Sequence, residues 1–117
     1  MSTVLQPAFG AAASKTTTRA QWQAAAEAWH RWGPFLGDWL GEATETMFDL
    51  VRIGPGSRVL DVAAGAGEQS ISAARRVGES GHVLATDIAP ALLERAAADA
   101  RAAGLSNLET RELLGLA

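Results

Sequence analysis

Small residues follow an acid at the point where an apolar segment gives way to a helical pattern. Residues 58–67 read RVLDVAAGAG. Glycine costs backbone entropy and small side chains add little packing energy, so such a run needs another reason. Backbone N–H groups beside the first turn of a helix favour an anionic or polar ligand group when no side chain covers them. A ligand that lies directly against the backbone explains the pattern.

A second acid is predicted at the same edge of the sheet. Residues 58–63 and 82–87 are predicted strands, and a helical pattern over 68–77 connects them. A crossover of that length favours parallel pairing, which brings the carboxyl ends of both strands to one edge. Asp87 closes the second strand, where a carboxylate can accept hydrogen bonds from two ribose hydroxyls. The two features together predict a site for a nucleoside-bearing cofactor.

Alternating strands and helices around this site predict an α/β fold. The crossovers are long enough for helices, which is typical of the first half of a doubly wound sheet. Two helices are expected to precede it: a capping-box pattern starts one at Thr18, Gly33-Pro34 ends it, and an apolar stripe marks the next. The predicted helices are 18–32, 35–51, 68–77 and 90–103, and a third strand is expected to begin at 107.

Composition limits the possible partners and sites. The chain has 117 residues, 48% of them hydrophobic, which suits one modest domain with a core. A net charge of −3 argues against a nucleic-acid-binding face. The absence of cysteine excludes disulfides and thiolate metal sites, and no metal site is predicted. Because no apolar run or signal-peptide pattern is present, we expect no membrane span and a cytoplasmic location.

Two cofactor classes compete for the glycine turn. The dinucleotide fingerprint is G-x-G-x-x-G, and the run from Gly65 to Ser70 lacks its third glycine. Glu68 stands where a pyrophosphate would approach and would repel it. A ligand that carries an ammonium group is more compatible with this charge. The pattern therefore favours S-adenosylmethionine (SAM), with an NAD-binding half-domain as the alternative.

Two consecutive motifs resemble those of a known enzyme family. Motif I and the next acidic motif of class I SAM-dependent methyltransferases resemble VLDVAAGAGEQS and GHVLATDIAP. The branch that acts in ubiquinone and menaquinone biosynthesis is similar upstream as well, in WQAAAEAWHRWGPFL and IGPGSRVLDVA. The likeness covers roughly residues 18–112. It implies a Rossmann-like fold and methyl transfer from SAM to a small-molecule acceptor, quinone-like or similar.

The resemblance also implies roles for single residues. Asp61 would fix the methionine end of the cofactor, Asp87 would hold the ribose hydroxyls, and Ile88 would pack on the adenine. Ala63 replaces the family's first glycine, and its methyl group is tolerated if the position does not need a positive φ. No residue is assigned a catalytic role. The loop residues expected to line the cofactor are Ala63, Ala64, Gly65 and Gly67.

The family sheet has seven strands, and this sequence reaches only the third. We therefore expect an incomplete sheet and a truncated fragment that is inactive alone. The domain boundaries expected are a flexible tail over 1–17, N-terminal helices over 18–52 and the truncated SAM-binding domain over 53–117. The first strand would become a bare apolar edge, which invites self-association or pairing with a complementing chain. A non-catalytic subunit that pairs through this edge is a further alternative.

The four tryptophans are interpreted mainly as helix-packing residues. In the resembled branch the N-terminal helices cover the cofactor cleft, which would bring a tryptophan to its wall. His30 and His82 are interpreted as structural. The position that matches the family's adenine-contacting acid falls on Leu114.

Overall fold

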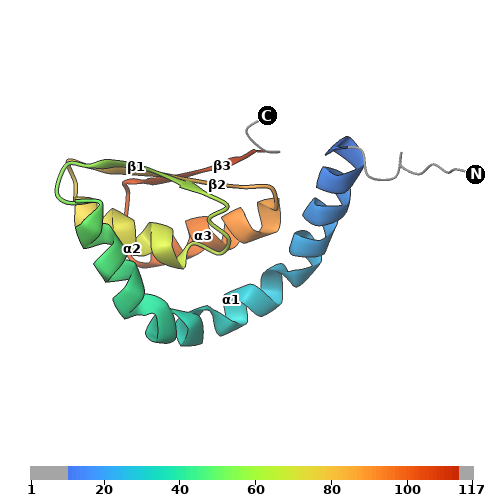
Figure 1. The fold of residues 1–117 in the computed structure, drawn as a ribbon, viewed down its shortest axis with the longest axis horizontal. Coiled ribbons are helices and arrows are strands. Elements are labelled where there is room, and N and C mark those ends of the chain that lie inside the picture. Colours follow the sequence, from blue (N-terminus) through green and yellow to red (C-terminus); the bar gives the residue numbers. More distant parts are fainter. Residues whose placement is uncertain (1–10, 114–117) are drawn as a thin grey trace, which may run out of the picture.

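A three-stranded parallel sheet with the order β1-β2-β3 forms the centre of the computed structural model, which describes residues 11–113. The strands are β1 (Arg58–Val62), β2 (His82–Asp87) and β3 (Leu108–Glu112). Asp61 pairs with Ala85, and Asp87 pairs with Glu112. The parallel pairing predicted from the crossover lengths is confirmed, and the carboxyl ends of all three strands meet at one edge (Figure 1).

Two helices cover one face of this sheet. They are α2 (Glu68–Val77) and α3 (Pro90–Ala102), both close to their predicted bounds (Figure 1). Gly78 caps α2 with a φ of 68°, as its predicted stop requires, and Pro90 opens α3. Val77 and Val83 are fully buried between helix and sheet, together with Ala73, Ala74 and Phe48. The α/β fold class is confirmed.

The N-terminal region differs from the prediction because it forms one helix, α1 (Ala11–Leu50), with Pro34 inside it. The helix begins before Thr18 and continues through Gly33. Proline removes one backbone hydrogen bond and bends a helix, and packing on both sides can offset that loss. Figure 1 shows α1 as an arc around the body of the molecule. Residues 1–10 of the predicted tail lie outside the described residues.

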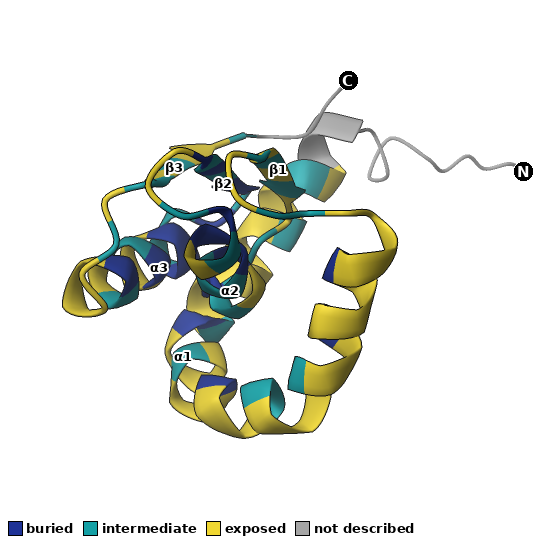
Figure 2. Cartoon of the chain, turned by 90° about the vertical axis from the view of Figure 1, so that its left-hand side faces the viewer, coloured by how far each residue is buried: buried dark blue, intermediate teal, exposed yellow. Residues whose placement is uncertain are grey.

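Both halves of α1 are attached to the body. In the first half, the Arg19 guanidinium donates to the Ile88 carbonyl at 3.2 Å and pairs with Glu112. In the second half, Arg76 of α2 pairs with Asp49 at 2.8 Å and lies over the Phe48 ring. Buried residues line the inner side of α1, whereas most of its outer side is exposed (Figure 2). The helix therefore closes over the carboxyl edge of the sheet.

Strand β1 is an edge strand within the described residues, since it pairs only with β2. On the face without helices, Leu60 is 57% exposed and Val62 is 50% exposed. These are the apolar positions that the sequence predicts for a buried strand. In residues 11–113, no helix is long and apolar enough to cross a membrane.

Candidate functional site

The connection from β1 to α2 is a tight loop over residues 63–67. Ala63, Gly65 and Gly67 all have positive φ, at 59°, 63° and 94°. The Ala64 N–H donates to the Thr86 carbonyl at 2.8 Å, which attaches the loop to the end of β2. From the sequence, we expect the Ala63 methyl group to be tolerated if this position does not need a positive φ. The position does have a positive φ, which is the conformation that favours glycine.

The Asp87 carboxylate holds this loop in place. Its Oδ2 accepts the Gly65 N–H at 2.9 Å, and its Oδ1 accepts the Ala89 N–H at 3.0 Å. The residue is 8% exposed. A carboxylate group has more acceptor positions than these two hydrogen bonds use.

Asp61 fixes the other end of the loop. Its Oδ2 accepts a hydrogen bond from the buried Ser70 hydroxyl at 2.5 Å, which connects β1 to α2. Burial raises the pKa of Asp61, the Ser70 hydrogen bond opposes that change, and the negative charge of Asp87 adds to the rise. The loop therefore lies between two carboxyl groups.

The two predicted loop glycines serve different purposes. A Cβ on Gly67 would lie 2.6 Å from the Cβ of Ala96, so glycine there lets the loop pack against α3. A Cβ on Gly65 would meet no atom within 4 Å. The loop surface at Gly65 is therefore open to a ligand.

A cleft of about 300 Å³ separates this loop from α1. Its volume lies at the lower end of the range for small-molecule sites. The wall contributed by α1 is mainly apolar, and the Trp22 and Trp29 rings lie 5.6 Å apart. The lining residues are Trp22, Trp29, Leu36, Gly37, Leu40, Gly41, Thr44, Ala63, Ala64, Gly65, Ala66, Glu68, Gln69, Ser72 and Leu92.

The structure places only part of the predicted set in the cleft wall. Ala63, Ala64 and Gly65 line it. Asp61 and Asp87 lie behind the loop that they hold, and Gly67 is buried beneath it. Ile88 lies outside the wall, where its carbonyl accepts from Arg19. Leu114 lies outside the described residues.

The sequence interpretation left most of the α1 wall unassigned. The residues that face the loop from α1 precede it by more than 20 positions in the sequence, and only the tryptophan-rich leader signalled their involvement: Leu36, Gly37, Leu40 and Gly41. The glycines belong to one helix face, where an added Cβ at Gly37 or Gly41 would meet no atom within 4 Å. Their missing side chains leave the cleft open.

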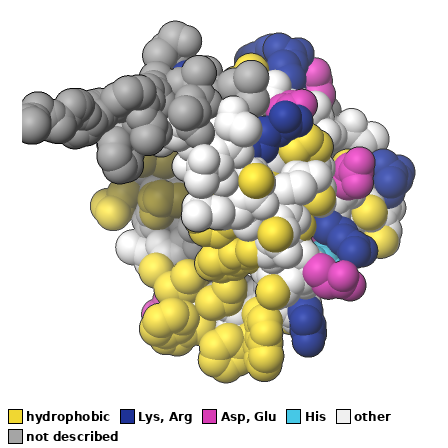
Figure 3. Space-filling model, turned by 90° about the vertical axis from the view of Figure 1, so that its right-hand side faces the viewer, with side chains coloured by type: hydrophobic (Ala, Val, Ile, Leu, Met, Phe, Trp, Pro, Cys, Tyr) yellow, Lys and Arg dark blue, Asp and Glu magenta, His cyan; other side chains and the backbone are white. Residues whose placement is uncertain are grey.

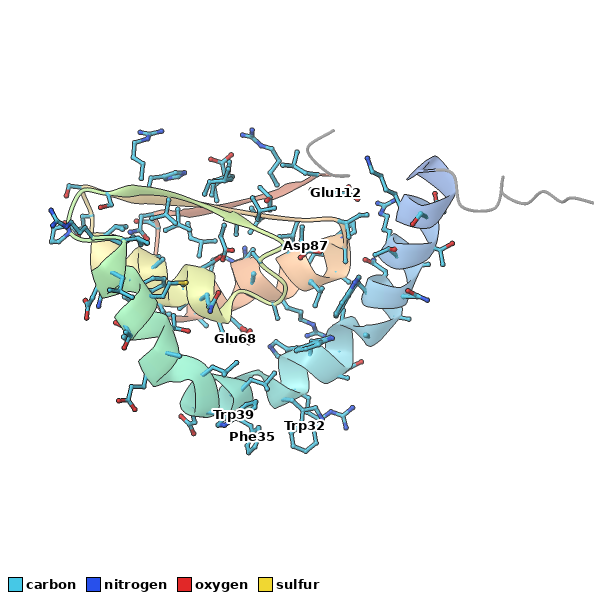
Figure 4. The ribbon with its side chains drawn as sticks, viewed as in Figure 1. Trp32, Phe35, Trp39, Glu68, Asp87 and Glu112 are labelled. Atoms are coloured by element: carbon cyan, nitrogen blue, oxygen red, sulfur yellow. The ribbon has the colours of Figure 1, made fainter. Side chains whose placement is uncertain are left out.

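The charge of the cleft is negative. Glu68 begins α2, and its carboxylate lies in the space that a Gly33 side chain would occupy. No lysine, arginine or histidine is among the described residues that line the cleft. Figure 4 shows Glu68 and Asp87 on the side of the sheet that faces α1. Such a site disfavours a diphosphate and suits a ligand with a positive charge.

The strained loop yields a stability prediction. We expect Ala63→Gly to stabilise the protein by about 0.5–1 kcal/mol, because relief of the left-handed backbone outweighs the added entropy of glycine in the unfolded chain. Urea unfolding measures the change. The matched control is Ala64→Gly, since Ala64 is not among the described residues with positive φ. It should destabilise by about 0.5–1 kcal/mol. Equal destabilisation by both substitutions would show that the loop is not strained at Ala63.

Curated proteins with related sequences match part of this chain. An uncharacterised protein of Mycobacterium tuberculosis is 40% identical over 113 residues, which cover 88% of this chain and 35% of its own length. Nocamycin O-methyltransferase of Saccharothrix syringae is 40% identical over 65 residues, covering 56% of this chain and 23% of its own. This chain thus spans about a third or less of the length of these curated relatives.

A solved structure and a family model both match methyltransferases. A SAM-dependent methyltransferase of Aquifex aeolicus superposes with a TM-score of 0.56 at 30% identity, covering 60% of this chain and 37% of its own. The family model described as a methyltransferase domain matches residues 53–113, which include the loop and both carboxylates. This chain belongs to the methyltransferase domain family.

Proposed function

We propose that this chain is the cofactor-binding part of an enzyme that transfers a methyl group from SAM. The observation that carries the proposal is the glycine loop, open at Gly65 and held between Asp61 and Asp87 beside a cleft without basic side chains. Family membership and the SAM-dependent structural relative support it.

The residues present fit SAM. The unused acceptor positions of Asp87 would take the ribose hydroxyls, and the bare backbone at Gly65 would let the sugar approach. Asp61 would act on the methionine end through the loop that it positions. Ile88 would pack on the adenine if the ligand extends past β2. SAM supplies a methyl group activated by a positively charged sulfur.

The cleft would serve the reaction by orienting the cofactor and the methyl acceptor relative to each other. The wall from α1 excludes water from one side, and the loop fixes the other, so that two bound reactants are held in line. The apolar wall carries no group that we assign as a general base. We propose that residues 18–52 act mainly as this cover and that residues 53–117 hold the cofactor.

The acid at Glu68 argues against the alternative of an NAD-binding half-domain. A dinucleotide needs its diphosphate near the first turn of α2, where Glu68 stands. No basic side chain lines the described cleft wall that could hold a diphosphate there.

We further propose a flat, apolar acceptor, as the ubiquinone-like branch of the family would use. Trp22, Trp29 and Leu40 provide a wall that suits an aromatic ring. The nocamycin relative is named as an O-methyltransferase, which supports a small-molecule acceptor.

We also propose that the free edge of β1 pairs with a complementing strand and that this chain alone is inactive. Leu60 and Val62 are half-exposed or more, and β1 has no charged side chain on its outer face beyond Arg58 to discourage pairing.

The cofactor proposal predicts selective binding. Isothermal titration should show binding of S-adenosylhomocysteine and none of NAD. We expect Asp87→Ala to weaken binding at least tenfold, because each hydrogen bond to a charged group contributes about 1.5–3 kcal/mol. Glu94→Ala removes an exposed acid of α3 and should leave the affinity unchanged. Binding of NAD but not of S-adenosylhomocysteine would reject the assignment.

The acceptor proposal predicts a difference between two tryptophans of α1. A naphthoquinone should bind the complex with S-adenosylhomocysteine, as followed by tryptophan fluorescence. We expect Trp29→Ala to weaken this binding about tenfold, since Trp29 lines the cleft, and Trp32→Ala to leave it unchanged. Equal effects of the two substitutions would place the quinone elsewhere.

The edge proposal predicts capture of a second polypeptide. The part of the M. tuberculosis relative outside the matched region, produced separately, is the probe. We expect it to co-purify with this chain and to slow hydrogen exchange at β1. Leu60→Lys places a charge on the edge and should abolish co-purification, whereas Glu79→Lys, in an exposed turn, should not. Capture that is insensitive to Leu60→Lys would argue against pairing at β1.

A further inference from the structure

Three aromatic side chains project from the outer side of α1 and form an outer aromatic patch. Trp32, Phe35 and Trp39 are 57%, 63% and 71% exposed. Their spacing places them on one helix face, opposite the buried Ala26 and Thr44. Figure 4 shows the three pointing away from the body, and Figure 3 shows hydrophobic side chains gathered at the bottom of the molecule. None of the three lines the cleft, so they do not belong to the proposed cofactor site.

The patch has the size of surface patches that are often functional, but it is too small for a tight complex. At roughly 200–250 Å² per large aromatic side chain, the exposed parts total on the order of 400 Å². That lies within the range of patches that are often functional. In a standard interface each partner buries about 800 Å², so the area of the patch is about half of one partner's share. The area therefore fits a weak, concentration-dependent contact.

Two opposite charges flank the patch on one side. Arg31 and Asp38 are both exposed and are separated by two helical turns. Within residues 11–113, neither side chain makes a hydrogen bond or ion pair. Their midpoint falls near Phe35, which is also the middle of the patch.

We propose that this patch is the interface between two copies of this chain, with their α1 helices antiparallel about a two-fold axis near Phe35. In an antiparallel pair the same side of both helices meets, so Arg31 of one copy lies beside Asp38 of the other, and the reverse. A parallel pair would put the charged flanks of the two helices on opposite sides of the interface, where neither charge meets its opposite. The surface is thus complementary to itself.

The charges around the patch disfavour other occupants. Asp38 and Glu42 are exposed acids next to the aromatic rings. They repel an anionic lipid surface and nucleic acid. A second copy, in contrast, supplies the Arg31 that Asp38 lacks.

Sedimentation velocity over a wide concentration range tests the interface. We expect the full chain to shift from monomer to dimer, with a dissociation constant in the micromolar range or weaker. Trp39→Glu should weaken the dimer at least tenfold. Val51→Glu, at an equally exposed apolar residue outside the patch, should leave it unchanged. Far-UV circular dichroism checks that both variants remain folded.

A charge exchange tests the orientation. Arg31→Asp or Asp38→Arg alone should weaken the dimer about three- to tenfold, whereas the double variant, or a mixture of the two single variants, should restore it. A wild-type chain that stays monomeric, or that binds neutral or anionic vesicles through Trp39 instead, would overturn the proposal. So would a dimer that survives Trp39→Glu, or a double variant without recovery.

Discussion

The Asp87 carboxylate and the Gly65 N–H make the contact on which the candidate site depends. Their hydrogen bond, 2.9 Å long, joins the end of β2 to the turn that follows β1. Because the strands are parallel, the two ends already lie at one edge, and the bond only has to fix the loop there. Asp87 is 8% exposed and its carboxylate accepts a second backbone N–H, from Ala89, on the other oxygen. One side chain thereby fixes the shape of the loop.

The same edge explains why α1 matters. The loop offers only one wall, and the cleft exists because a helix from the start of the chain returns over it. Glycines at 37 and 41 face the loop and leave the gap open, while Ala26 of α1 belongs to the same buried cluster as Ala66 of the loop. The outer side of the same helix carries exposed aromatic rings, two of which, Trp32 and Phe35, contact each other edge to face. We propose that one side of this helix contributes to the ligand site and the other to an interface between two copies of the chain.

Local patterns predict the strands and the two helices after β1 almost to the residue. Asp87 at the end of one strand and Gly78 after a helix are short-range signals, and tertiary packing agrees with them. Pro34 shows where local patterns fail: the sequence predicts a helix end there, but α1 continues through it. The helix continues because α1 also contacts α2 and α3, and only the fold creates these contacts. The φ of Ala63 and the α1 wall of the cleft are likewise tertiary facts, because they follow from how distant segments meet.

A crystal structure of the chain with S-adenosylhomocysteine tests the central claim most directly. The ribose hydroxyls should lie within hydrogen-bond distance of Asp87, with the sugar against the backbone of Gly65 and the ligand between the loop and α1. A ligand bound away from this loop, or a loop closed so that Gly65 is covered by protein, would contradict the account.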